Sequence, residues 1–357
     1  MPRLTGLRLE RARASKQFHD GAFRNPSGMG PYLKGNRAAV VGGLLFGGRA
    51  RIPSAPLPVE SPLSAWQKPV SSQGLRITWL GHSTLLLEVD GARVLTDPVF
   101  GERASPLSFA GPKRFHPVPA TIAQLPPLDA VLLSHNHHDH LCPSSVRELA
   151  QRKVPIITSL GVGADLERLG VEPALITELD WWEQHTLPGG ALAFTATPAQ
   201  HFSGRGLADR NATLWSSWVL TTARRRLFFS GDTGLTPEFA TIAERLGPFD
   251  VTMLEIGAWN AAWGQMHLGP ENALAALDLL GGGTLLPIHW GTFDLALHRW
   301  DEPAETLLTL AQATGKRVLT PLHGRPFEPA HQEAPTPWWR EVRAAQEALQ
   351  PATARAP

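Results

Sequence analysis

An apolar segment at residues 130–134 is followed at once by a run of imidazoles and one carboxylate, His135-Asn136-His137-His138-Asp139-His140. A short apolar segment predicts a buried strand, and the loop after a strand is where functional side chains are commonly held. Imidazole nitrogen and carboxylate oxygen are suitable ligands for zinc and similar divalent ions. The alternation of His135 and His137 lets both rings converge on one ion, while Asp139 and His140 can face a second. The run therefore predicts a metal site at the end of a strand.

Short apolar runs and helical patterns alternate from residue 75 onward. Strands are predicted at residues 76–80, 84–89, 93–96, 130–134, 154–158, 192–197, 214–221, 227–230, 251–255 and 284–288. Helices are predicted at residues 143–151, 237–245, 270–280 and 303–314. The pair Asp90-Gly91 predicts a tight hairpin turn. Strands covered by helices indicate an α/β fold built as a layered sandwich.

Three regions differ in composition. Residues 1–74 are rich in glycine, proline and arginine and lack periodicity, which predicts an extended arm that wraps the core. Residues 75–330 are expected to form the main domain, and residues 331–357 a C-terminal helix and tail. The apolar stretch at residues 38–48 is far shorter than the roughly 20 residues of a spanning helix, so it cannot cross a bilayer.

Charge and cysteine content exclude several kinds of partner and site. Lys plus Arg number 33 and Asp plus Glu number 32, so the net charge gives no argument for binding nucleic acid. Cys142 is the only cysteine, so neither an intrachain disulfide nor a thiolate cluster can form. No apolar segment of signal-peptide type follows the basic N-terminus, which predicts a cytoplasmic location.

Three further candidate ligands closely follow later predicted strands, namely His201, Asp232 and His289. Taken alone, Asp232 is typical of a turn, and either histidine is typical of an ordinary core or surface position. One loop supplies at most four ligands, so a two-metal site must recruit others from distant loops. The shared position of these three residues after apolar runs favours that role.

Several motifs stand in consistent order between residues 23 and 326. Beside the histidine run, these are Trp79-Leu80-Gly81-His82-Ser83-Thr84, Thr96-Asp97-Pro98-Val99-Phe100, Pro198-Ala199-Gln200-His201-Phe202-Ser203, Gly231-Asp232-Thr233-Gly234 and Pro287-Ile288-His289-Trp290-Gly291-Thr292-Phe293. With them the sequence resembles the metallo-β-lactamase superfamily, and more narrowly its branch of phospholipases D that hydrolyse N-acyl-phosphatidylethanolamine. The resemblance implies a four-layer αββα sandwich for residues 75–330, as the catalytic domain.

The resemblance also implies two zinc ions per chain. One would be bound by His135, His137 and His201, the other by Asp139, His140 and His289, with Asp232 as the bridge. Such a pair lowers the pKa of a shared water to supply hydroxide near neutral pH, and neutralises charge on a phosphoryl oxygen during in-line displacement. Asp139 and Asp232 are therefore expected to act in catalysis as well as in metal binding.

Four other residues are expected near this centre. His267 is the candidate proton donor to the leaving oxygen, because the family places a histidine there, and a capping or packing role is the alternative. Asp97 and His82 are expected to orient ligand imidazoles, with a simple turn role as the alternative for Asp97. His138 has the wrong spacing for a ligand and is expected in the outer shell or facing solvent.

Tryptophan is frequent, with 12 Trp against one Tyr. Four of these rings are predicted in loops beside the site, where they would line an acyl-chain groove or lie at a membrane interface, with core and lid packing as the alternative: Trp181, Trp182, Trp259 and Trp263. The apolar residues 40–46, flanked by Arg37, Arg49 and Arg51, add to this pattern. Together they predict peripheral contact with a membrane.

We expect a zinc-dependent phosphodiesterase that releases an N-acylethanolamine and leaves phosphatidic acid. The alternative is another hydrolase of the same fold, such as a lactonase or a sugar-phosphate lactone hydrolase, because fold does not determine substrate. An iron-dependent redox protein and a metal-free binding module are disfavoured, since redox relatives usually carry a carboxylate where this chain has His137 and all seven ligands are present. A nuclease is disfavoured by the near-zero net charge. The expected partner is a phospholipid or another small molecule, and a homodimer is a further hypothesis.

Overall fold

Two β-sheets dominate the structure. The computed structural model describes residues 4–30, 42, 49–107, 109–206, 208–263, 265–331 and 334–348. The first sheet contains β3 (Leu75–Gly81), β4 (Thr84–Val89), β5 (Ala92–Thr96), β6 (Ala130–Leu133), β7 (Ile156–Ser159), β8 (Ile176–Leu179) and β16 (Pro326–Phe327). The second contains β9 (Gln184–Thr186), β10 (Ala193–Thr197), β11 (Ser217–Thr221), β12 (Arg226–Phe229), β13 (Val251–Glu255), β14 (Thr284–Ile288) and β15 (Arg317–Val318).

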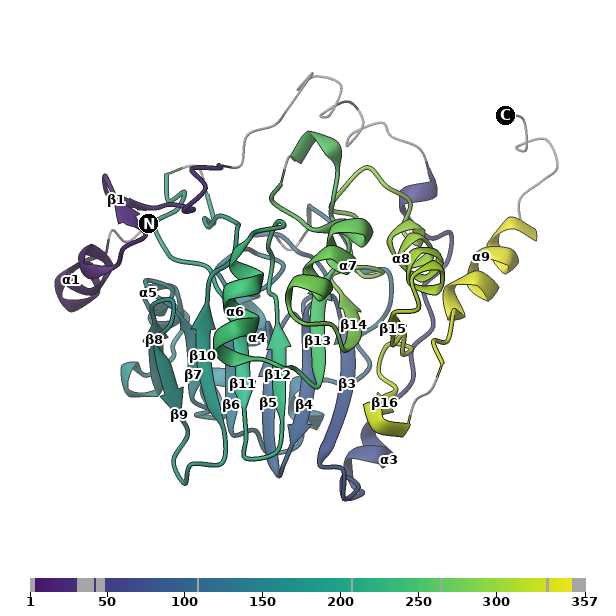
Figure 1. The fold of residues 1–357 in the computed structure, drawn as a ribbon, viewed down its shortest axis with the longest axis horizontal. Helices are drawn as coiled ribbons and strands as arrows, with labels where there is room; N and C mark the ends of the chain where they lie inside the picture. The colour runs from purple at the N-terminus through teal and green to yellow at the C-terminus, as the bar shows by residue number, and fades with distance from the viewer. Residues whose placement is uncertain are drawn as a thin grey trace.

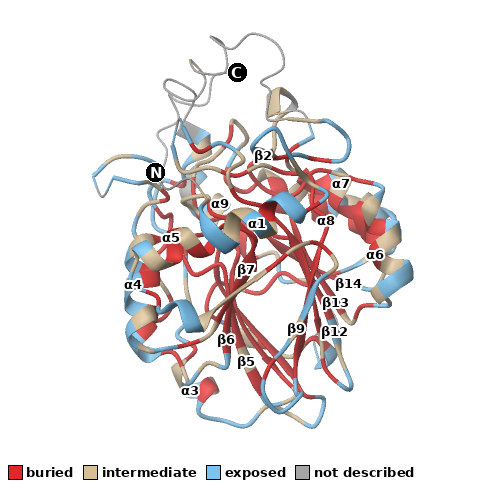
Figure 2. Ribbon diagram, turned by 90° about the vertical axis from the view of Figure 1, so that its left-hand side faces the viewer, coloured by how far each residue is buried: buried red, intermediate tan, exposed pale blue. Residues whose placement is uncertain are grey.

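Helices cover the outer faces of the two sheets. In the described part of the chain, the strand orders are β16-β3-β4-β5-β6-β7-β8 and β15-β14-β13-β12-β11-β10-β9 (Figure 1). The first sheet is covered by α4 (Pro143–Gln151) and α5 (Gly163–Arg168), and the second by α6 (Glu238–Leu246), α7 (Gly269–Leu279) and α8 (Glu302–Ala313) (Figure 2). The strands, which Figure 2 shows in red, are buried, and the inner faces of the two sheets meet in an apolar core that includes Trp79, Trp218 and Phe229. This arrangement confirms the predicted four-layer αββα sandwich.

Each sheet contains a block of parallel strands. The pairs β5–β6, β6–β7 and β7–β8 are parallel in the first sheet, as are β12–β13, β13–β14 and β14–β15 in the second. Strands β6, β13 and β14 are buried along their whole length, which explains their unbroken apolar sequences. Ligands of α/β sheets bind beyond the carboxyl ends of parallel strands. The loops after these strands are therefore the place to look for a site.

The local predictions hold closely for three strands and for one hairpin turn. Strands β4, β13 and β14 have the predicted bounds. Asp90 and Gly91 form a two-residue connection between the paired residues Val89 and Ala92, and both adopt positive φ values, 47° and 91°. Two successive positive φ values are what a hairpin turn of this length requires.

The strand predicted at residues 214–221 begins only at Ser217. The residues before it form hydrogen bonds with the other sheet. The backbone N–H of Leu214 donates to the carbonyl oxygen of Leu160, and that of Ser216 donates to the carbonyl oxygen of Ser134. Both acceptors lie just after strands of the first sheet. This segment therefore ties the two sheets together instead of extending β11.

The N-terminal region is not extended throughout, contrary to the prediction. Residues Gly6–Ala14 form helix α1, followed by a small ribbon of β1 (Phe18–His19) and β2 (Ala22–Phe23). Arg8 of α1 pairs with Glu167 at 2.8 Å and with Glu178 at 2.5 Å. Ala12 is the one buried residue of this helix. Helix α1 is thus held mainly by ion pairs. Because it buries no continuous apolar face, hydrophobic periodicity in the sequence could not reveal it.

Two further helices flank the sandwich, α3 (Leu63–Trp66) and α9 (Trp338–Ala348). Trp339 of α9 is fully buried, and its Nε1 donates to Glu305 of α8 at 2.8 Å.

The division into arm, main domain and C-terminal helix remains a prediction. Apart from Gly42, residues 40–46 lie outside the described residues, as does Arg37. Across the described chain, no helix combines the length and apolar character needed to cross a membrane.

Candidate metal centre

The loops at the carboxyl ends of the strands hold several residues in left-handed backbone conformations. His82, Asp97, Ala258 and His289 have φ values of 52°, 31°, 53° and 64°. Non-glycine residues seldom adopt such values, which persist where surrounding contacts over-determine them, often at functional sites. Their concentration here indicates that side-chain placement in these loops overrides local backbone preference.

The first candidate ligand cluster consists of His135, His137, His201 and Asp232, whose ligand atoms all lie within 4.8 Å of one another. Nδ1 of His137 lies 2.8 Å from Nε2 of His135 and 3.2 Å from Nε2 of His201. Oδ2 of Asp232 lies 3.6 Å from Nε2 of His201 and 4.0 Å from Nε2 of His135. Three imidazoles and one carboxylate thus converge on a single point, as a tetrahedral cation site requires.

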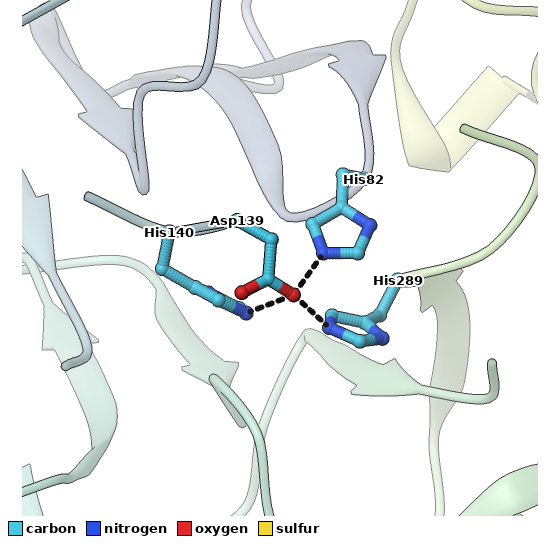
Figure 3. A group of neighbouring side chains, drawn as sticks. All are labelled: His82, Asp139, His140 and His289. Atoms are coloured by element: carbon cyan, nitrogen blue, oxygen red, sulfur yellow. Dashed lines mark hydrogen bonds and ion pairs between the residues drawn. The ribbon is translucent and has the colours of Figure 1, made fainter. Parts of the chain in front are cut away.

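The second cluster consists of His82, Asp139, His140 and His289 (Figure 3). Oδ2 of Asp139 lies 3.1 Å from Nε2 of His82 and 3.5 Å from Nε2 of His289. The same oxygen lies 3.7 Å from Nε2 of His140. Oδ1 of Asp232 lies 3.1 Å from Nε2 of both His140 and His289. Asp232 therefore turns one oxygen toward each cluster.

These donor atoms lack partners of their own. Within the described residues, Nε2 of His140, Oδ1 of Asp232 and both ring nitrogens of His289 are buried without a hydrogen bond. Leaving a buried polar atom unsatisfied costs about 1–3 kcal/mol, and more when the group is charged. A divalent cation between the rings and the carboxylates would satisfy Nε2 of His140, Nε2 of His289 and Oδ1 of Asp232, so the residues fit a metal.

The pKa shifts agree with this chemistry. Burial lowers the pKa of His135 and of His201 well below the usual value, which keeps their lone pairs free. Burial raises the pKa of Asp232, but the rings of His140 and His289 outweigh it and hold that pKa well below its usual range. Burial lowers the pKa of His289, but Asp232 outweighs it and raises the pKa to about 10. A proton on that ring thus occupies the position where a cation would bind.

Asp97 and Ser134 orient two of the candidate ligands. Oδ2 of Asp97 accepts hydrogen bonds from Nδ1 of His140 and from the Ser134 hydroxyl, each at 2.7 Å. Oγ of Ser134 also lies 2.9 Å from Nδ1 of His135. Asp97 therefore contacts a candidate ligand imidazole, and His82 contacts both the carboxylate of Asp139 and the ring of His289, 3.8 Å away between centroids. Ser134 carries no sequence signal beyond its place before the histidine run.

His267 stands beside the two clusters, paired with Glu255. Its Nδ1 lies 2.6 Å from Oε2 of the fully buried Glu255, and its ring centroid lies 5.1 Å from that of His201 and 5.5 Å from that of His289. Burial lowers the pKa of His267, but the Glu255 carboxylate outweighs it and raises the pKa above its usual value. Glu255 is absent from the sequence prediction, although it ends β13 just as candidate ligands follow other strands.

A pocket of about 310 Å³ gives access to both clusters. Its polar wall consists of His137, Asp139, His201, Asp232, His267 and His289. The rest of the wall is apolar and consists of Phe202, Ala258, Trp263, Met266 and Leu295. No lysine or arginine lines the described part of this pocket. Negative charge on a substrate would therefore be neutralised by bound cations rather than by basic side chains.

The four tryptophans expected beside the site have different environments. Trp263 lines the pocket, and Trp259 stacks on His298 with 4.7 Å between ring centroids. Trp182 lies beneath the guanidinium of Arg245. Trp181 is buried, and its Nε1 donates to the backbone of Trp215, so the packing alternative is correct for this residue.

Comparison with known proteins determines the family. Residues 92–290 match a family model described as the beta-lactamase superfamily domain. The chain belongs to the metallo-β-lactamase superfamily. It is 44% identical to an uncharacterised protein of Mycobacterium tuberculosis, over 91% of this chain and 88% of that protein. It is 37% identical to N-acyl-phosphatidylethanolamine-hydrolyzing phospholipase D 1 of Caenorhabditis elegans, over 68% of this chain and 71% of that enzyme.

Solved structures agree with this assignment. The isothiocyanate hydrolase from Delia radicum gut bacteria has a TM-score of 0.55 and 25% sequence identity, covering 71% of this chain and 98% of its own. Family, neighbours and ligand clusters together make this member of the metallo-β-lactamase superfamily a metal-dependent hydrolase.

Replacing Asp232 with Asn should empty at least one of the two clusters. The amide keeps the shape but loses the charge that both clusters share, so elemental analysis should find less metal per chain and turnover should fall by orders of magnitude. Circular dichroism should show an intact fold. Asp250→Asn is the matched control, because Asp250 pairs with Arg225 at 2.6 Å outside the pocket lining. Full activity with two ions retained in Asp232→Asn would rule out the bridge.

Proposed function

We propose that this superfamily member is a zinc-dependent phosphodiesterase of the phospholipase D type, acting on N-acyl-phosphatidylethanolamine or a related phospholipid. The observation that carries the proposal is the position of Asp232 between two ligand clusters that line one pocket, whose other lining residues, apart from His267, are apolar. The similarity to the phospholipase of Caenorhabditis elegans supports the substrate class. The products would be an N-acylethanolamine and phosphatidic acid.

One zinc ion would be held by His135, His137 and His201 and the other by Asp139, His140 and His289, with Asp232 shared. Bound there, two ions supply Lewis acidity toward a phosphoryl oxygen and lower the pKa of water. The chain contributes preorganisation, since Asp97 and Ser134 hold the rings of His140 and His135 in place. The apolar wall excludes bulk water and accommodates the uncharged substituent next to the phosphate.

His267 would serve as the proton donor. Its Nδ1 is held by Glu255, which leaves Nε2 for the pocket that the ring lines. As the oxygen of water bonds to phosphorus and the water gives up one proton to solvent, the bond from phosphorus to the ethanolamine oxygen breaks. The proton of His267 passes to that leaving oxygen, and Glu255 keeps the ring oriented throughout.

His267→Ala should lower kcat by about 10²- to 10⁴-fold, the usual contribution of general acid catalysis. Metal content, measured by elemental analysis, should stay at the wild-type value, because His267 is not among the proposed ligands. His331→Ala is the matched control, since that ring is largely exposed. An unchanged kcat would exclude the acid role, and a parallel loss of metal would instead make His267 part of the ligand set.

A soluble small molecule is the second candidate substrate. The isothiocyanate hydrolase, at 25% identity, favours it, because its architecture matches this chain over 98% of its own length. A lactone is the corresponding substrate from the sequence analysis. Both alternatives use the same metal centre and differ only in what the apolar wall accommodates.

Zinc-loaded protein should hydrolyse N-acyl-phosphatidylethanolamine with a higher kcat/KM than a simple water-soluble phosphodiester. The difference is expected because the apolar wall at Phe202, Trp263 and Leu295 can bind an acyl group but not a bare diester. An acyl lactone and an isothiocyanate complete the substrate panel. Turnover confined to the lactone or the isothiocyanate would refute the phospholipase assignment.

Peripheral contact with the membrane, from the cytoplasm, is part of this proposal. Support comes from the loop between Arg103 and Lys113, which pair as an isolated β-bridge. Phe109 of this loop is 78% exposed, and Leu107 is 47% exposed. Arg103 and Lys113 line a cavity of about 720 Å³ that the exposed Ile52 also lines. Exposed apolar side chains next to cations are typical of surfaces that bind anionic lipid.

Vesicles rich in phosphatidylglycerol should therefore sediment with the protein more strongly than vesicles of phosphatidylcholine. Phe109→Ala should weaken this binding by about 10- to 100-fold, since burying an aromatic side chain in lipid contributes roughly 1.5–3 kcal/mol. Leu7→Ala is the control, because Leu7 is 71% exposed on α1. Equal binding by wild type and Phe109→Ala would exclude this loop as the membrane contact.

The hypothesis of a homodimer is tested separately, by the mass of the lipid-free protein in light scattering.

A further inference from the structure

Two residues of the histidine run, Asn136 and His138, are not candidate ligands. Both side chains contact the segment that follows His201. Oδ1 of Asn136 accepts a hydrogen bond from the backbone N–H of Gly204 at 2.9 Å, and Nε2 of His138 lies 3.2 Å from the carbonyl oxygen of Arg205. The non-ligand positions of the run thus dock one ligand-bearing loop onto another.

The guanidinium of Arg205 completes this contact. Its Nη1 donates to the carbonyl oxygens of Asn136 at 2.6 Å and of Leu141 at 3.0 Å. Its Nη2 lies 2.9 Å from Nδ1 of His138. The two carbonyls stand on either side of the segment 137–140, which carries three candidate ligands. One side chain therefore spans the loop from end to end.

Arg205 is itself held by its neighbours. Its backbone N–H donates to Oδ2 of Asp209 at 2.9 Å, and the N–H of Gly206 donates to Oδ1 of the same residue at 2.8 Å. On the other side, Nδ2 of Asn136 donates to Oδ2 of Asp165 at 2.9 Å. Arg205 and Asn136 are thus each held in place by an aspartate that is not a candidate metal ligand.

We infer that Arg205 is a positioning residue for the metal centre. It locks the loop that carries His137 against the loop that carries His201, so the imidazoles of the first cluster are preorganised for an ion. Without the guanidinium, two loop carbonyls and one imidazole nitrogen would lose their donor, and the loops would pay ordering entropy on binding the metal. A lysine cannot replace the fork, because its ammonium is a point charge without fixed donor geometry. The inference rests on the proposed metal centre.

Zinc affinity of the metal-free protein, measured by competition with a chromophoric chelator, tests this role without any substrate. Arg205→Ala should bind zinc roughly 10- to 100-fold more weakly, the usual effect of losing a residue behind the ligands. Arg205→Lys should fall between Arg205→Ala and wild type. The absorption bands of Co²⁺-loaded protein should shift in both variants, because the ligand geometry changes. Arg325→Ala is the control, since Arg325 pairs with Glu60 in an exposed ion pair.

The result for Arg205→Ala supports or overturns the positioning role of Arg205. Wild-type zinc affinity and Co²⁺ bands in a folded Arg205→Ala protein would overturn it. If Arg205→Ala does not fold, as judged by circular dichroism, Arg205→Lys decides in its place: weakened zinc binding supports the role and wild-type binding overturns it. Wild-type protein that binds no zinc would instead refute the proposed metal centre.

Discussion

The face-to-face packing of the two sheets sets the distances across which the candidate ligands meet. The first sheet supplies the histidine run after β6, whereas His201, Asp232 and His289 follow strands of the second sheet. Neither sheet alone brings a complete set of donors to one point. The apolar core between them also offsets the cost of burying carboxylates and imidazoles, which would be expensive without opposite charges nearby. Chemistry at the edge of the sandwich therefore depends on packing in its middle.

The strand-end position was the most informative signal in the sequence. Strands buried on both faces give short unbroken apolar runs, and a polar residue just after such a run has to lie at the sheet edge. This reasoning, together with the family resemblance, found His201, Asp232 and His289, which the structure places in contact with the histidine run. Glu255 carries the same signal and lies against His267. It was missed because a glutamate at the end of an apolar run also fits as the last residue of a strand.

Other features could not be predicted because they depend on segments far apart in the chain. Arg8 holds α1 against the sandwich through Glu167, 159 residues away in the chain. The local sequence of α1 gives no indication of this partner. Arg205 reaches Asn136 across 69 positions. The late start of β11 has the same origin, since its first expected residues bond to loops of the other sheet. Local patterns predict elements, whereas such contacts appear only when the sandwich has closed.

The pocket is lined by two sets of side chains, the candidate metal ligands and the apolar residues that would contact substrate. The imidazoles and carboxylates come from loops constrained by hydrogen bonds and left-handed backbone, so substitutions there disturb several contacts at once. Phe202, Trp263, Met266 and Leu295 line the same pocket without being part of either ligand cluster. Substrate preference can consequently drift through changes in these apolar residues while the metal centre stays intact. A fold arranged in this way can diversify its substrates over evolutionary time without rebuilding its chemistry.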